Sequence, residues 1–171
     1  MSIKLCIALW VTFNVLGFIV FCQSSAADES APLTKEQVFA LLPTGIDMDI
    51  NDANKYHKLK EYGSRSYPAL VEILKDADDN LLIGRIFAVF IGAKGDKTIA
   101  VNAVKGIIKK FRGKNTYDAV KVRWYAARTL GKIGKPDDIP ALNELVNDND
   151  EMVRVTAIRA VAELRKKEDN P

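Results

Sequence analysis

The stretch Val122-Arg-Trp-Tyr-Ala-Ala-Arg-Thr-Leu-Gly131 is followed 31 residues later by the similar stretch Val153-Arg-Val-Thr-Ala-Ile-Arg-Ala-Val-Ala162. Between them lies Ile139-Pro-Ala-Leu-Asn-Glu-Leu-Val-Asn-Asp148, whose counterpart is Tyr67-Pro-Ala-Leu-Val-Glu-Ile-Leu-Lys-Asp76. Similarity at a spacing of roughly 30–40 residues, with apolar residues at helical intervals inside each unit, is typical of stacked helical repeats. The chain is therefore predicted to be all-α and built from stacked helical hairpins.

The N-terminal segment differs in character from the rest of the chain. Residues 5–21 contain no charged side chain, Lys4 precedes them, and small polar residues follow. This order is typical of a secretory signal, so we expect residues 1–26 to be a cleaved signal peptide. The protein is then expected to be periplasmic or secreted, in a bacterial cell envelope. Two alternatives stay open: residues 5–21 could remain as a membrane anchor, or Cys22 could carry a lipid, although the bulky Phe21 disfavours lipid processing.

Both cysteines, Cys6 and Cys22, precede the expected cleavage after Ala26. The mature chain would then contain no thiol, which excludes disulfides, thiolate metal sites and cysteine nucleophiles. The remainder is long enough to stabilise itself through an apolar core.

The rest of the chain is predicted to contain one helical domain at residues 35–165, between a flexible leader at 27–34 and a charged tail at 166–171. Predicted N-caps are Thr34, Asp52 and Asp96, and Asp118 is predicted to begin the helix that ends at Ile133. The residues Ile99, Ala103, Ile107 and Phe111 are expected to form one buried stripe. The helices are predicted at residues 35–42, 52–62, 67–75, 80–93, 97–111, 118–133, 139–147 and 151–165.

Four features of the repeated stretches resemble HEAT repeats, in particular the bilin-lyase type. They are the Ile-Pro-Ala-Leu start at 139–142, the acidic turn after it, the Val-Arg pair at 153–154 and the Leu-Gly-Lys-Ile-Gly exit at 130–134. The resemblance extends over residues 67–165. It implies a right-handed α-solenoid of about three to four hairpins, with residues 35–62 as a degenerate first pair. Gly84 departs from the pattern, because it stands where the later repeats have arginine.

The resemblance also assigns structural roles within the repeat. It implies that Arg123 and Arg154 reach the acidic turn of the same or the adjacent repeat. Carboxylates before a helix favour its N-terminus, and a proline in the first turn needs no N–H partner. The structural repeat residues are Arg123, Arg154, Asp148, Asp150, Gly131, Gly134 and Pro140.

The polar side of the helix predicted at 118–133 is the candidate binding surface. Lys121, Tyr125, Arg128 and Lys132 recur at helical spacing there, and Trp124 lies beside them. The resemblance to HEAT repeats places this side on the concave face. The alternative is that Trp124 and Tyr125 pack against the preceding helix. The predicted partner-binding residues are Lys121, Trp124, Tyr125, Arg128, Lys132 and Arg159, the last from the following repeat.

Charge is segregated along the chain. Residues 105–135 contain ten Lys or Arg and a single acid, Asp118, whereas the segments on both sides are acidic. Such a positive band could attract an acidic protein segment, an anionic lipid headgroup or a polyanionic glycan. The alternative is a solvated surface without a ligand.

Residues that could carry chemistry do not form a recognisable site. His57 is the only histidine, and the calcium-loop-like runs at 47–51 and 76–80 lack the later glycine and glutamate that such a loop requires. We therefore expect no metal, no cofactor and no enzymatic activity. The predicted function is an exported protein-binding scaffold. The alternatives are a bilin-lyase-like protein that handles tetrapyrroles and a binder of an anionic envelope component; export argues against a nucleic-acid partner.

Overall fold

The structure, a computed structural model, describes residues 31–43 and 50–169. From Pro32 onward the chain forms one compact unit, and within the described residues every regular element is helical. Short 3-10 turns lie at Gly63–Ser66 and Pro136–Asp138. The helices are α2 (Lys35–Leu41), α3 (Ile50–Tyr62), α4 (Tyr67–Asp76), α5 (Asn80–Gly92), α6 (Thr98–Phe111), α7 (Tyr117–Ile133), α8 (Ile139–Val146) and α9 (Glu151–Asp169).

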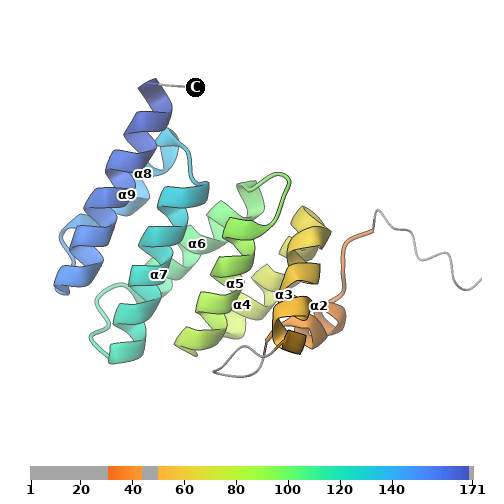
Figure 1. Ribbon diagram of the computed structural model, residues 1–171. Coiled ribbons are helices and arrows are strands. Elements are labelled where there is room, and N and C mark those ends of the chain that lie inside the picture. The colour runs from red at the N-terminus through yellow and green to blue at the C-terminus, as the bar shows by residue number, and fades with distance from the viewer. Residues whose placement is uncertain (1–30, 44–49, 170–171) are drawn as a thin grey trace, which may run out of the picture. The chain divides into compact units, whose positions relative to one another are not determined.

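The helices form two layers that run the length of this unit (Figure 1). In one layer α3, α5, α7 and α9 lie side by side, and in the other α2, α4 and α6 follow one another, with α8 packed on α9. Each hairpin thus adds one helix to each layer. This is the α-solenoid that the repeated sequence predicts, and α2 with α3 forms its first pair.

The core follows the apolar face of each helix. On α7, Val122, Ala126 and Leu130 recur at helical spacing and are fully buried. On α6 the predicted stripe is partly wrong, because Ile99 is 46% exposed and Val104 lies in the core instead. The reason is that α6 packs against both α4 and α7, so its buried side is broader than one row and is rotated away from Ile99.

The starts of the helices confirm two predicted caps and correct two other predictions. Thr34 caps α2 in a capping box, as predicted. Asp52 lies inside the first turn of α3 rather than at its cap. Asp96 precedes the first residue of α6 by two positions, and its carboxylate accepts a hydrogen bond from the Thr98 N–H at 3.0 Å, so it caps α6 as predicted. α7 begins at Tyr117, one residue before the predicted start at Asp118, and its cap is Thr116. A carboxylate inside the first turn complements the positive end of the helix as a capping carboxylate does. The sequence alone therefore does not distinguish a residue that caps a helix from one that lies in its first turn.

The last helix is longer than predicted. It continues to Asp169, whereas the sequence predicts that it ends at Arg165. The extension is held because the Lys167 ammonium donates hydrogen bonds to three carbonyls at the end of α7, those of Gly131, Lys132 and Gly134, at 3.0–3.2 Å. Lysine at a helix C-terminus satisfies carbonyls that lack intrahelical partners.

The predictions for the signal peptide, the membrane anchor and lipidation of Cys22 concern residues outside the described part of the chain. Among the residues that are described, no helix combines the length and apolar character needed to cross a membrane.

Candidate functional site

Arg123 connects consecutive hairpins. Its side chain leaves α7 and is only 1% exposed. The guanidinium donates to Asp148 in the α8–α9 turn, from Nε to Oδ2 at 2.6 Å and from Nη2 to Oδ1 at 2.9 Å. Nη1 donates to the carbonyls of Phe111, at 3.1 Å, and of Lys114. A planar fork that satisfies a buried carboxylate and two carbonyls is a task to which arginine is suited.

Asp148 is the centre of this turn. Burial alone raises the pKa of its carboxyl group, but the hydrogen bond from Arg123, the backbone N–H of Asp150 and the charges of Arg123 and Arg154 outweigh burial and hold the pKa below its ordinary value. Arg154 donates to the carbonyls of Asp148 and Asn149, at 2.7 and 2.9 Å. Arg123 thus reaches the adjacent repeat and Arg154 its own, as the resemblance implies.

Local geometry explains why the repeat has small and capping residues at fixed positions. Asp150 accepts a hydrogen bond from the N–H of Val153 at the start of α9, and Pro140 lies in the first turn of α8. A Cβ on Gly131 would lie 2.8 Å from the Cβ of Ala160. Gly131 therefore allows the close approach of α7 and α9.

A row of aromatic and cationic side chains follows the exposed side of α7. The Lys121 ammonium lies 5.4 Å from the centroid of the Tyr117 ring and 5.5 Å from that of Trp124, and the Arg128 guanidinium lies 6.0 Å from Trp124. These distances are in the range of cation–π contacts. Sequence analysis missed Tyr117, which is 72% exposed, although its position four residues before Lys121 extends the same row.

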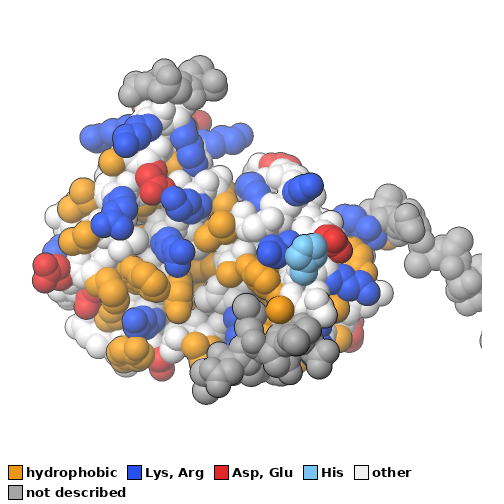
Figure 2. Space-filling view, in the orientation of Figure 1, with side chains coloured by type: hydrophobic (Ala, Val, Ile, Leu, Met, Phe, Trp, Pro, Cys, Tyr) orange, Lys and Arg blue, Asp and Glu red, His pale blue; other side chains and the backbone are white. Residues whose placement is uncertain are grey.

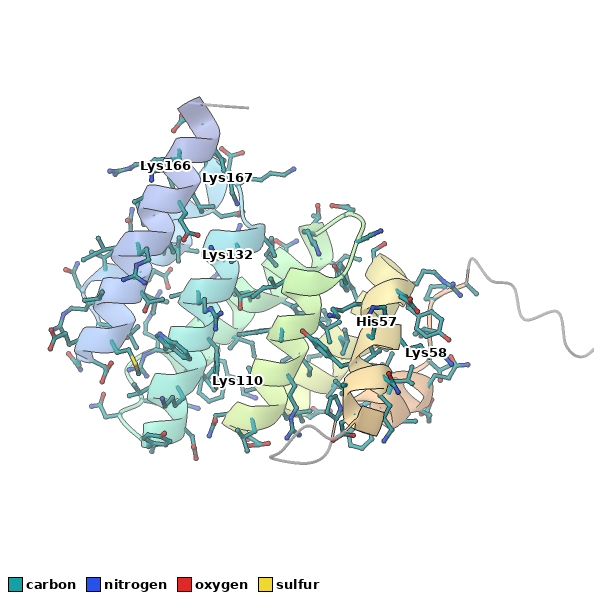
Figure 3. All side chains as sticks on the ribbon, in the orientation of Figure 1. His57, Lys58, Lys110, Lys132, Lys166 and Lys167 are labelled. Carbon is teal, nitrogen blue, oxygen red and sulfur yellow. The ribbon has the colours of Figure 1, made fainter. Side chains whose placement is uncertain are left out.

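A hollow of about 400 Å³ lies between α7 and α9 beside this row. It brings together Trp124, Arg128, Lys132 and Arg159, which are four of the six predicted partner-binding residues. Lys132 also forms an ion pair with Glu163 at 3.2 Å across the hollow. Figure 2 views this layer and shows basic side chains beside hydrophobic ones over α7 and α9, and Figure 3 labels Lys132.

Tyr125 does not join this hollow. Its ring lies over Gly84 of α5, where an added Cβ would be 3.1 Å from Cε2. It lines a second hollow, of about 290 Å³, with residues of α3 and α5 such as Tyr56 and Phe87 respectively. Tyr125 therefore packs against a preceding helix, which is the alternative given above for both aromatic residues, whereas Trp124 lies on the side of α7 that faces α9. The centroids of the two rings are 4.8 Å apart.

The same contact accounts for Gly84. An arginine at this position would occupy the space of the Tyr125 ring. The loop between α6 and α7, at residues 112–116, also contains no acid for it to bind. The arginine of the repeat is thus absent from the hairpin that has neither space for its side chain nor a carboxylate to bind it.

Half of the cations in the positive band are paired with acids in the folded chain. Five of its ten cations contact acids that precede or follow the band in the sequence. The segregation of charge therefore serves in part to join neighbouring hairpins. Among the described residues, Lys121, Arg128 and Arg159 make no ion pair. The five pairs are Lys105–Asp138, Lys110–Asp78, Arg112–Glu144, Arg123–Asp148 and Lys132–Glu163.

The other candidate sites do not gather metal ligands. Within the described residues there is no group of three or more His, Cys, Asp or Glu side chains placed to hold a metal ion. Asp76 pairs with Lys35 and Asp79 caps α5, whereas residues 47–49 lie outside the described part. His57 lies on α3 with Nδ1 3.3 Å from Glu61, next to Lys58 (Figure 3).

Comparison with known families agrees with this geometry. Residues 116–171 match the protein-family model for HEAT repeats. The match begins at the cap of α7 and includes α8 and α9. This part of the chain contains the α7–α9 hollow and the hydrogen bonds between Arg123 and Asp148. Neither the curated proteins nor the solved structures contain a significant match. HEAT repeats commonly provide extended surfaces for protein–protein interaction.

Proposed function

We propose that this protein is an exported, non-catalytic scaffold that binds another protein through the exposed side of α7 and α9. We call this surface the α7–α9 face. The observation that supports it is the position of Trp124, flanked by cations and beside an open hollow. The face consists of Tyr117, Lys121, Trp124, Arg128, Lys132 and Arg159.

The chemistry of the face favours a partner with negative charge next to an apolar side chain. Tryptophan, tyrosine and arginine supply much of the binding energy in protein interfaces. Lys121, Arg128 and Arg159 make no ion pair within the described residues and are available to carboxylates. Glu163 is the acid that lines the α7–α9 hollow, and Lys132 already pairs with it. An acidic protein segment with an apolar side chain would use the cations and the indole together, and the common role of HEAT repeats in protein binding favours it over an anionic lipid or glycan.

Export is part of the proposal and is supported by the sequence of residues 1–26. N-terminal sequencing and intact mass of the protein recovered from the cell envelope test it. A start at Ala27 supports cleavage, an unprocessed N-terminus indicates an anchor, and added lipid mass at Cys22 indicates a lipoprotein. Recovery in the cytoplasm alone would contradict export. The pigment-handling alternative rests on the repeat resemblance, and visible absorbance that stays with the protein after free bilin is removed would favour it.

The binding proposal is tested by affinity capture of the tagged protein from envelope extract. We expect a specific partner to be recovered with the wild type and lost with the double variant Trp124→Ala, Arg128→Glu. Lys58→Glu on α3 makes a similar charge change at an exposed residue far from this face in the sequence, and it should retain the partner. Equal recovery of the partner by the double variant and the wild type would refute the α7–α9 face as the binding surface.

A further inference from the structure

The outward side of α9 carries exposed apolar side chains. Met152 is 40% exposed, Val155 48% and Ile158 54%, and Ala162 is also exposed. In Figure 1 α9 stands at one end of the layer, and no described helix lies beyond it. In repeat proteins a helix side without a neighbour is normally polar, so exposed apolar side chains here indicate a packing surface.

The internal repeat indicates what the outward side of α9 packs against. Val155, Arg159 and Ala162 occupy the positions that Trp124, Arg128 and Gly131 hold on α7, 31 residues earlier. On α7 those positions meet a helix: Gly131 approaches Ala160 of α9, and Trp124 and Arg128 line the hollow against it. Ala162 keeps the small side chain at the position where two helices approach most closely. The outward side of α9 therefore has the features of a helix-packing surface.

Charge on α9 favours a second α9 in the antiparallel direction. Glu151 lies in the first turn and Lys166 near the end. The midpoint between them is also the midpoint between Val155 and Ala162. A two-fold axis through this point would place Glu151 opposite Lys166 of the second copy and Val155 opposite its Ala162. Such self-complementarity is what an isologous interface requires. Neither Glu151 nor Lys166 makes an ion pair within the described residues.

We propose that two copies of this chain associate through antiparallel packing of α9 on α9. The interface uses Glu151, Met152, Val155, Ala162 and Lys166. Arg159, which belongs to the α7–α9 face, lies next to this axis, but the variants that test the dimer leave Trp124, Arg128 and Arg159 unchanged. Loss of the dimer and loss of the proposed binding function are therefore distinguishable. The partner is a second copy rather than an unrelated helix, because one two-fold axis relates both the charged pair, Glu151 and Lys166, and the apolar pair, Val155 and Ala162.

The first test is sedimentation equilibrium of the protein purified with the N-terminus that the cell leaves on it. We expect a concentration-dependent dimer, and Val155→Asp should weaken it by about tenfold or more, since it places two buried charges at the interface. Ile99→Asp introduces the same charge at a similarly exposed apolar residue of α6 and should leave the dimer unchanged. A monomer at every concentration up to the solubility limit would refute the proposal, as would a dimer insensitive to Val155→Asp.

The second test distinguishes this pairing from any other use of α9. Glu151→Lys and Lys166→Glu should each weaken the dimer by about threefold to tenfold, because each places like charges opposite one another in both halves. The double variant should restore the dimer. Both changes oppose the helix dipole, so greater helix stability cannot explain that restoration. A double variant as weak as the single ones would overturn the antiparallel register, and circular dichroism of every variant verifies folding.

Discussion

The Arg123 guanidinium of α7 and the Asp148 carboxylate of the α8–α9 turn are joined by two parallel hydrogen bonds, and both side chains are almost completely buried. They are 25 residues apart in sequence. Because α8 and α9 meet at this turn, the pair fixes the position of the last hairpin on the preceding one. The same guanidinium binds the carbonyls of Phe111 and Lys114, so it also holds the end of α6.

Arg123→Lys should therefore lower the free energy of unfolding by about 2–4 kcal/mol, because lysine retains the charge but cannot satisfy the carboxylate and two carbonyls together. Urea denaturation measures the loss. Arg154→Lys is the matched control, since Arg154 is only half-buried and binds backbone carbonyls of its own turn. It should cost about 1 kcal/mol or less. Equal losses for the two variants would contradict the connecting role of Arg123.

The depressed pKa of Asp148 gives this contact a defined pH dependence. The unfolded chain binds the proton more tightly, at its ordinary pKa of 3.8. The stability that ionised Asp148 provides is thus fully present above about pH 4 and is lost as pH falls through the lower, folded-state pKa. Asp148→Asn should be less stable than the wild type at neutral pH, and the difference should shrink below about pH 4. Urea titrations between neutral and acidic pH measure it; a difference that is constant with pH would contradict the assignment.

The fold could be predicted from sequence because the two similar stretches determine most of it. The apolar spacing of Val122, Ala126 and Leu130 identifies the buried side of α7 without any knowledge of its neighbours. The ends of helices are less predictable. Lys167 extends α9 because carbonyls of α7 are within reach, and the sequence of a charged tail contains no sign of that distant contact.

The candidate site could be predicted only in part for the same reason. The spacing of Lys121, Trp124, Arg128 and Lys132 places them on one side of a helix, which the structure shows. It does not reveal that Tyr125 turns toward Gly84, since that depends on the room left by another helix. The pairing of cations with acids of other hairpins is likewise a tertiary property, so the net charge of a segment overstates its exposed charge.

The contact of Tyr125 with Gly84 predicts opposite effects for two glycine substitutions. Gly106 lies inside α6 with nothing within 4 Å of an added Cβ, so Gly106→Ala should stabilise the protein by about 0.5–1 kcal/mol. Gly84→Ala gains the same helix propensity but pushes on the Tyr125 ring, and should be at least about 1 kcal/mol less stable than Gly106→Ala. Thermal denaturation with calorimetry compares the two.

Tryptophan emission provides a local reading of the same prediction. The ring centroids of Trp124 and Tyr125 are 4.8 Å apart, so movement of Tyr125 changes the surroundings of the indole. Gly84→Ala should shift the emission maximum, and Gly106→Ala should leave it unchanged. If Gly84→Ala stabilised the protein as much as Gly106→Ala and left the emission unaltered, the close contact of Tyr125 with Gly84 would be ruled out.

Removing the lysine that caps α7 should loosen the end of the solenoid. Lys167→Met deletes the ammonium that donates to three carbonyls near the end of α7, and we expect a loss of about 1 kcal/mol. Lys58→Met on the exposed side of α3 (Figure 3) is the control and should change stability by less than about 0.5 kcal/mol. Hydrogen exchange gives the sharper measurement, because Lys167→Met should speed exchange at the C-terminal turn of α7 and in the last turn of α9 together. Faster exchange in α9 alone would mean that Lys167 does not hold the two helix ends to one another.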